Sequence, residues 1–583
     1  MSRTNVFLKV LFLSASIFLF SGRSHAQAGS SVMVHILNNP ESLIPFNSTS
    51  IEEINIEDQI FETLLRMDPI THEPDMPWLA EALPVESNDH KQYDFTLRKG
   101  IKFADGTKLT GADVIFSLKA AKNPFGAGHT TLQSSLDWVQ RAELVDGDPY
   151  KIRFIVSKPY WQIRQFVFAS ILTILPKHIF DPKNFTDAYS WDDIDKLQPK
   201  NYDELNALKE QMPDSPMVLS AQYFEEISRD PDRILGSGPY QIEEWRINDR
   251  VALKKNPNYR NRNNSEFGKA YPDRIIYKQI SDPTAAVTAL KTKYLDVIGY
   301  LQLSLWKNID TTSFPFLSKT AFPQSSFAYI GWNIERPYFR DQKVRLALAH
   351  LIDRKMMIDT ILYGQAEQIQ SVVPKFRREY NSNIPLIDYN PETARRLLKE
   401  AGWEDHDGDG IIDKRIGGKL IPFKFSFICN AGNLVRRNCL LVLAESFRQV
   451  GIQADVYAVE WSVLLDNLRN HNFDATYGAW QNDEGETDNY QLYHSSQTKN
   501  NGSNFGNWKS KRADSVLEAI RNEMDAGKRQ DLEKEFQQIF YEEQPVALLW
   551  SPYTAVVWNN RFDNVKWYSL RQGYNPAWWI PRK

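Results

Sequence analysis

The stretch "FTLRKGIKFADGTKLTGADVIFSLKAA", residues 95–121, carries the signals of a strand, a tight turn and a helix start in succession. From Tyr93 to Leu97 apolar and polar side chains alternate, as they do in a half-buried strand. Asp105-Gly106 is a dipeptide typical of hairpin turns. Thr110, followed three residues later by Asp113, is the pattern of a helix N-terminus. The stretch therefore predicts strands and a helix close together.

Both periodicities recur along the chain. Strand patterns occupy residues 31–37, 326–334 and 545–559, and the last of these predicts two buried strands. Helix patterns occupy residues 51–68, 341–362 and 390–403. Residues 185–230 are polar and irregular, and predict an inserted surface segment. Because strands and helices intermix without strict alternation and without a repeat, the predicted fold class is mixed α/β with several lobes.

Composition sets limits on the function. The 583 residues suggest about three domains or lobes, since domains average roughly 100–200 residues. Aromatic residues make up 13% of the chain, enough to line a binding cleft or to fill a large aromatic core. The formal net charge is −4 and there is no basic stripe, so nucleic acid is not an expected partner.

The first residues predict export. Arg3 and Lys9 accompany the start of the apolar run at residues 10–20, and small residues precede a cleavage point before Gln27. We expect residues 1–26 to be a cleaved signal peptide; the alternative is a retained anchor. No Cys lies near Gln27, so a lipid anchor is not expected.

The sequence offers one possible disulfide and one possible metal site. Cys429 and Cys439 are the two cysteines, and a disulfide between them is left open, with free thiols favoured. The stretch "DHDGDGIID" places Asp405, Asp407, Asp409 and Asp413 as in the first nine positions of a calcium loop. The closing Glu is missing because position 416 is Ile, so an acidic turn is favoured and no metal or other cofactor is expected.

Enzyme signatures are absent from the sequence. There is no G-x-S-x-G, H-E-x-x-H, Walker loop or G-x-G-x-x-G, and the 10 His are scattered. An enzyme is therefore not expected.

Eight stretches, in this order, resemble the extracellular solute-binding proteins of family 5, the dipeptide- and oligopeptide-binding components of ABC importers. They run from residue 61 to residue 490: "FETLLRMDPITHEPDMPWLAEALP", "FTLRKGIKFADGTKLTGADVIFSLKAA", "ILPKHIF", "GSGPYQIEEW", "KKNPNYR", "GWNIERPYFRDQKVRLALAHLIDR", "YNPETARRLLKEAGW" and "YGAWQNDEGETDNY". Each stretch alone is weak, and the order together with the export signal is specific to the family.

The resemblance implies a two-lobed periplasmic-binding-protein clamshell with two hinge crossings, near Phe316 and Pro545. One lobe would carry an extra subdomain, and solute would be enclosed as the lobes close. The implied divisions are residues 1–26 for the signal peptide, 27–75, 170–315 and 546–583 for the first lobe, 76–169 for the extra subdomain and 316–545 for the second lobe.

The resemblance also implies a site. In the family's peptide binders an Asp shortly after a Trp pairs with the peptide's N-terminal ammonium, and the pattern falls here on Trp480 and Asp483. Trp480 would line the cleft or pack beneath it. An exposed strand at Phe327–Trp332, including Tyr329 and Gly331, would pair with the ligand main chain.

The neighbouring residues have lesser expected roles. Glu484 and Glu486 are expected to be solvated, and Asp488 with Asn489 to cap local backbone. The family's dipeptide binders place an Arg for the ligand carboxylate just before a helix of the second lobe. Residues 428–432, "ICNAG", have none. An oligopeptide therefore fits better than a dipeptide.

The expected function is capture of peptides in the periplasm and their delivery to an ABC permease by a monomeric, soluble carrier. The same fold binding an oligosaccharide, a metal chelate or a small amine remains an alternative. An exported hydrolase is a third.

Overall fold

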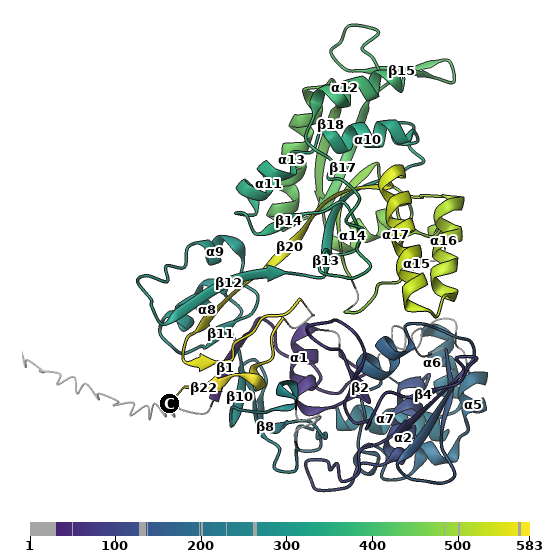
Figure 1. The fold of residues 1–583 in the computed structure, drawn as a ribbon, viewed down its shortest axis with the longest axis vertical. Helices are drawn as coiled ribbons and strands as arrows, with labels where there is room; N and C mark the ends of the chain where they lie inside the picture. Colours follow the sequence, from purple (N-terminus) through teal and green to yellow (C-terminus); the bar gives the residue numbers. More distant parts are fainter. Residues whose placement is uncertain are drawn as a thin grey trace, which may run out of the picture.

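A large mixed sheet runs through the whole molecule in the computed structural model (Figure 1). The structure describes residues 31–582 except 49, 127–135, 137, 198, 200–201, 229, 261–264, 483, 500–501 and 570–572. In order across the sheet, its main strands are β18 (Gln453–Val459), β17 (Lys424–Asn430), β19 (Ala475–Gln481), β13 (Ser326–Trp332), β20 (Val546–Asn559), β11 (Val297–Ile298), β1 (Ser31–Ile36), β10 (Arg274–Gln279), β9 (Arg250–Lys255) and β8 (Tyr240–Arg246).

The hydrophobic cores divide the described residues into two bodies. Three clusters draw their buried members from residues 32–317 and 557–579. Three others draw theirs from residues 327–550. We call residues 31–323 with 553–582 the N-terminal body, and residues 326–550 the C-terminal body. Each body thus buries its own apolar surface, the dominant stabilising term in folding.

Two strands connect the bodies. β12 (Leu317–Pro323) pairs antiparallel with β20 from Leu317↔Asn559 to Pro323↔Tyr553, and β13 pairs with the first part of β20 as far as Trp550. Figure 1 shows β12 and β20 running side by side from the N-terminal body into the C-terminal body. β14 (Ala366–Gln368) adds a short pairing on β20 from Pro552 to Trp550.

The stretch at residues 95–121 folds as the sequence predicts. β5 (Gln92–Thr96) lies in a four-stranded sheet ordered β4 (Val85–Glu86), β5, β7 (Lys151–Val156) and β6 (Val139–Leu144). At the turn, Gly106 has φ +92°, a conformation that glycine adopts without strain. α2 (Gly111–Lys122) begins where expected, and the Thr110 N–H donates to Asp113 Oδ2 at 2.8 Å. This sheet and helix pack into the largest core cluster.

Helices cover the bodies as follows. In the N-terminal body they are α1 (Ile51–Ile60), the π-helix η1 (Arg164–Ile171), α4 (Lys177–Phe180), the short 3₁₀ helix η2 (Phe185–Ala188), α5 (Trp191–Lys196), α6 (Tyr202–Gln211), α7 (Pro216–Ile227), α8 (Pro283–Lys291) and α9 (Leu303–Lys307). In the C-terminal body they are α10 (Gln342–His350), α11 (Arg354–Ile361), α12 (Pro391–Glu400), α13 (Leu434–Arg448), α14 (Trp461–Arg469), α15 (Tyr490–Tyr493), α16 (Lys511–Asn522) and α17 (Ala526–Glu543).

Three expectations about elements are wrong. The helix pattern at residues 51–68 ends with α1 at Ile60, and Leu65–Arg66 form the short strand β2. The helix pattern at residues 341–362 is two helices, α10 and α11, because Asp353 caps the second through the Met356 N–H. Residues 545–559 form the single strand β20 rather than two, and Pro552 lies where its pairing changes from β13 to β12. The segment 185–230, for which an inserted surface segment stays the prediction, contains α5, α6 and α7, which bury a small apolar cluster.

Cys429 and Cys439 are both free thiols buried in the C-terminal body, which settles the open question of a disulfide. Burial raises the pKa of the Cys439 thiol to about 12. Among the helices of the described residues, none combines the length and the apolar character needed to traverse a lipid bilayer.

Candidate functional site

β13, the strand expected to pair with a ligand, has no free edge. It pairs antiparallel with β19 along its whole length and with β20 on its other side. All seven of its residues are buried; Phe327 and Trp332 are 1% and 0% exposed. The expectation that this strand is exposed for main-chain pairing is therefore wrong. Its continuous apolar run is that of a central strand, covered on both faces.

The free edge in this region belongs to β19. On one side β19 pairs with β13 from Ala475 to Gln481, but on the other it meets β17 only at Ala475 and Thr476. No strand of the described residues pairs with this side of β19 from Gly478 to Gln481. Ala479 and Gln481 are exposed. An unpaired, exposed strand edge is a template for an added strand.

The direction of the main-chain groups follows from one hydrogen bond. The Asn482 N–H donates to Ser325 O at 2.7 Å, which continues the ladder between β19 and β13. Successive residues of a strand turn their N–H groups to opposite sides. The N–H and C=O groups of Trp480 and Gly478 therefore also point toward β13. Ala479 and Gln481 therefore present their N–H and C=O groups at the open edge.

A cavity of about 280 Å³ lies where β19 ends. It is lined from the N-terminal body by Ile51, Tyr300, Phe322, Thr554 and Ser569, from the C-terminal body by Gln481, and by Gln324 and Ser325 between them. The lining combines two aromatic rings with amide and hydroxyl groups. Apolar walls with a few polar groups are typical of small-molecule sites, which form preferentially between domains.

The side chain of Arg436 lies beside the open edge of β19. The Arg436 side chain, in the first turn of α13, donates from Nη1 to Asn430 Oδ1 at 3.0 Å. Its guanidinium lies 5.6 Å from the ring centre of Tyr477 on β19. No carboxylate of the described residues forms an ion pair with Arg436. Residues 428–432 contain no Arg, but the Arg436 side chain contacts Asn430, the last residue of β17.

The other expected site residues lie as follows. Asp483 falls outside the described residues. Trp480 is half-buried and stacks on Phe505, with ring centres 6.1 Å apart. Tyr329, Gly331 and Trp480 line a small cavity of about 30 Å³ inside the C-terminal body. Burial raises the pKa of Tyr329 to about 12, so its hydroxyl stays protonated.

The loop after β19 is less solvated than the sequence suggests. Asp488 caps local backbone as expected, accepting from the Tyr490 N–H at 3.0 Å. Glu486 is only 7% exposed and pairs with Arg529 at 2.7 Å, so the expectation that Glu486 is solvated is wrong. Its cation comes from a helix about forty residues later, which no local pattern indicates.

The acidic loop forms a compact turn. Oxygen atoms of Asp405, Asp407 and Asp413 lie within 4.8 Å of one another, and Asp409 is not part of that group. Asp405 accepts from the N–H groups of Gly408 and Gly410 at 2.7 and 3.0 Å. Asp413, which is buried, lies 2.6 Å from His406 Nδ1. Local hydrogen bonds thus account for the loop's shape, and the acidic turn stays a prediction.

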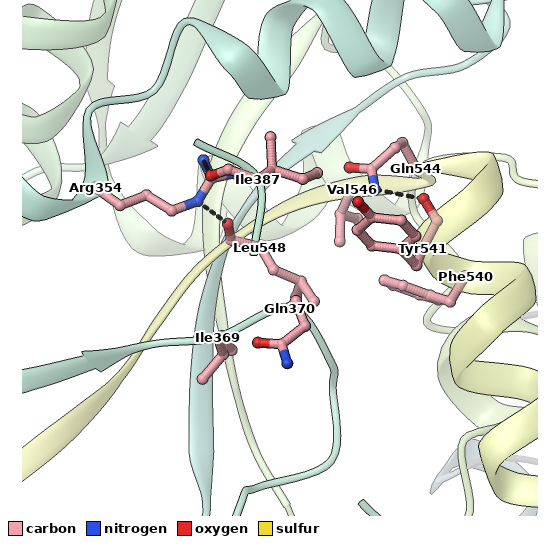
Figure 2. Close-up of a pocket in the computed structure, with 9 residues that line it drawn as sticks. All are labelled: Arg354, Ile369, Gln370, Ile387, Phe540, Tyr541, Gln544, Val546 and Leu548. Carbon is pink, nitrogen blue, oxygen red and sulfur yellow. Dashed lines mark hydrogen bonds between the residues drawn. The ribbon is translucent and has the colours of Figure 1, made fainter. Parts of the chain in front are cut away.

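A second, much smaller pocket serves packing. Figure 2 shows Arg354 reaching β20, where its Nε donates to Leu548 O at 2.7 Å. The pocket holds only about 10 Å³, too little for a solute. Burial lowers the pKa of Arg354 to about 10, which still leaves it charged at neutral pH. Arg354 therefore joins α11 to β20.

Comparison with known proteins agrees with this architecture. A model of the bacterial extracellular solute-binding proteins, family 5 middle, matches residues 76–502. The oligopeptide-binding protein AppA of Bacillus subtilis (strain 168) is 28% identical over 589 residues, covering 98% of this chain and 97% of AppA.

Solved structures share the fold. That of Bacillus subtilis AppA in complex with a nonapeptide covers 96% of this chain and 100% of its own, with a TM-score of 0.68 and 26% identity. NikA from Brucella suis in complex with Fe(III)-EDTA is 18% identical with a TM-score of 0.73, covering 95% of this chain and all of NikA. The family model spans most of the chain, and the chain belongs to the bacterial extracellular solute-binding proteins of family 5.

Proposed function

We propose that this protein binds peptides of several residues outside the cytoplasm and delivers them to an ABC permease. The observation that carries the proposal is the open edge of β19 from Gly478 to Gln481, which leads into a cavity lined by both bodies. An extended peptide main chain fits such an edge whatever its side chains. The similarity to AppA, whose name and structure concern oligopeptides, supports the same ligand class.

Charges at the two ends of the site suit a free peptide. Asp483, two residues beyond Gln481 in the chain, is proposed to pair with the peptide's ammonium group, as the family pattern implies. Arg436, which lacks an acid partner in the described part of the chain, is proposed to attract a carboxylate of the solute. Arg436 lies to one side of the β19 edge and does not block the path of a ligand along it. Ligands of more than one length are therefore expected.

The two bodies are proposed to be the lobes of a clamshell that closes around the solute. Their separate cores support this, as do β12 and β20, which begin directly after the expected crossings at Phe316 and Pro545. The four-stranded sheet with α2 lies inside the expected extra subdomain, residues 76–169. Closure of lobes about a few strand-terminal residues is an ordinary hinge motion.

The remaining parts of the proposal concern location and partners. We infer that residues 1–26 are removed during export to the periplasm, that no lipid anchor follows, and that the mature protein works as a monomer without catalysing a reaction. A transport carrier must release its solute unchanged.

The test is to express the protein from Gln27 onward, denature it and identify the released solute by mass spectrometry. Mixed peptides of a few residues are expected, and Asp483→Asn should then weaken their binding several-fold while Asp514→Asn, on α16, should not. A sugar, a metal chelate or a single small amine in place of peptides would overturn the peptide assignment and keep the fold. Solute converted to product during incubation would point to a hydrolase.

A further inference from the structure

A second contact between the bodies involves the loop that follows β19. From the N-terminal body, Gln162 donates from Nε2 to Glu486 O at 2.7 Å. Gln165, on η1, lies against Gly485. Both glutamine side chains are buried, at 1% and 4% exposed. Two buried amide side chains of one body thus contact the same loop of the other, residues 484–489.

The same loop is held from within its own body by two buried cations. Arg377 donates from Nη1 to Glu484 O at 2.8 Å and pairs with Glu379 at 3.0 Å. Arg529 pairs with Glu486 at 2.7 Å, and both side chains are almost wholly buried. Charge-assisted hydrogen bonds of this kind fix a loop more firmly than neutral ones. The shape of the loop is therefore fixed in part by groups of its own body.

Part of the burial of that ion pair comes from the N-terminal body. The guanidinium of Arg529 lies 4.4 Å from the ring centre of Trp161, which directly precedes Gln162. Trp161 also packs against a core cluster of the C-terminal body. Separation of the bodies would take Trp161 away from Arg529 and admit water to the ion pair. Cation–π attraction is stronger in a dry site, so this contact favours the closed arrangement.

A side chain at Gly485 would require the amide end of Gln165 to move. A Cβ at this position would lie 2.0 Å from Gln165 Oε1, 2.5 Å from its Cδ and 3.1 Å from its Nε2. These three nearest atoms all belong to Gln165, so the obstacle comes from the other body and not from the loop's own surroundings. The backbone of Gly485 is not in the left-handed region, so alanine can adopt it.

We propose that Gln162 and Gln165 are positioning residues that lock loop 484–489 when the bodies close, and that this lock sets how long a bound solute is retained. The inference rests on the proposed solute-binding function. The loop begins three residues after Gln481, which lines the cavity between the bodies. Holding the loop from both sides couples the shape of the solute cavity to closure. Neither glutamine lines that cavity, so the lock does not depend on contacts with a solute bound there.

The test is Gly485→Ala, which introduces a clash in the closed state alone. The methyl group must displace the buried Gln165 amide from the loop, and we expect this to raise Kd by up to about tenfold, which corresponds to about 1.4 kcal/mol. The probe is a synthetic copy of the peptide recovered most abundantly from the wild-type protein. Stopped-flow binding should show faster dissociation with an unchanged association rate, and the Tm of the peptide-free protein should stay the same.

Rescue and control variants separate the lock from a local structural effect. Gly485→Ala combined with Gln165→Ala removes the obstructing amide and should recover most of the lost affinity. Gly527→Ala, at the start of α17, should leave the affinity unchanged because no Gln165 atom is near it.

The outcomes are distinguishable. A Gly485→Ala affinity within twofold of wild type, or a loss that Gln165→Ala does not rescue, would overturn the lock and leave the proposed function intact. A wild-type protein that carries and binds no peptide would overturn the proposed function. In that case small-angle scattering still tests the lock. In the presence of whichever solute is recovered, the single variant Gly485→Ala should be more open than the double variant that also carries Gln165→Ala.

Discussion

The open edge of β19 can be closed by one substitution, Ala479→Pro. Proline has no N–H, so it removes the Ala479 donor, and its ring stands where an added strand would approach. The ladder to β13 is untouched, because that ladder uses Trp480 and Gly478 rather than Ala479. Proline is tolerated at a strand edge for this reason. The variant should fold.

The loss of affinity can be worked out from the groups at the edge. Proline removes the hydrogen bond from Ala479 and, by obstructing the strand, the bond from Gln481. At about 0.5–1.5 kcal/mol net for each bond, the loss is about 1–3 kcal/mol. Since 1.4 kcal/mol is a factor of ten, Kd for a bound peptide should rise about 5- to 150-fold.

The assay is isothermal titration calorimetry with a peptide recovered from the wild-type protein, alongside circular dichroism to confirm folding. Ala479→Val is the matched control, because it adds bulk of similar size, suits a strand and keeps the N–H. A folded proline variant that binds with wild-type affinity would refute main-chain pairing at β19. An equal loss in the valine variant would show that bulk, and not the N–H group, is responsible.

Three further expectations concern stability. Burial raises the pKa of Glu57 to about 8, so the stability it contributes is fully present below about pH 4.5 and is lost as pH rises through about 8. The Tm of Glu57→Gln should therefore rise relative to that of the wild type across this window. Equal Tm curves from pH 4.5 to 9 would contradict this. Trp332→Ala should cost about 3–5 kcal/mol in urea unfolding, whereas Trp461→Ala, at an exposed position, should change it by less than about 0.5 kcal/mol. Calcium at millimolar concentration should leave Tm unchanged because Ile416 stands where a calcium loop needs its bidentate Glu, and a rise that Asp407→Asn abolishes would establish a metal site.

Local signals predicted local structure well. The alternation from Tyr93 to Leu97 and the Thr110–Asp113 pair gave β5 and the start of α2, because both patterns depend on residues within one turn or one strand. The helix at residues 341–362 was misjudged where Asp353 caps a second helix, since its apolar spacing continues across the break. The family resemblance was confirmed by the family model.

The site was predicted less well, because the order of strands in a sheet depends on residues far apart in the sequence. The run from Phe327 to Trp332 is correctly a strand, but its neighbours β19 and β20 come from about 150 and 220 residues later. The open edge of β19 arises because β17 pairs with only its first two residues, which depends on where β17 ends. Likewise Glu486 is buried by Arg529 and Gln162, from different parts of the chain.

β20 also determines when the protein can fold. This strand supplies the partner of β11 and β12 in one body and of β13 and β14 in the other, yet it begins at residue 546 of 583. Until the ribosome has made it, both halves of the large sheet lack a central strand and expose apolar edges. Domains of long chains generally fold as units, whereas here the large sheet cannot be completed until β20, about 220 residues after β13, has been made. Because this one strand completes both halves of the sheet, neither body can finish folding independently of the other.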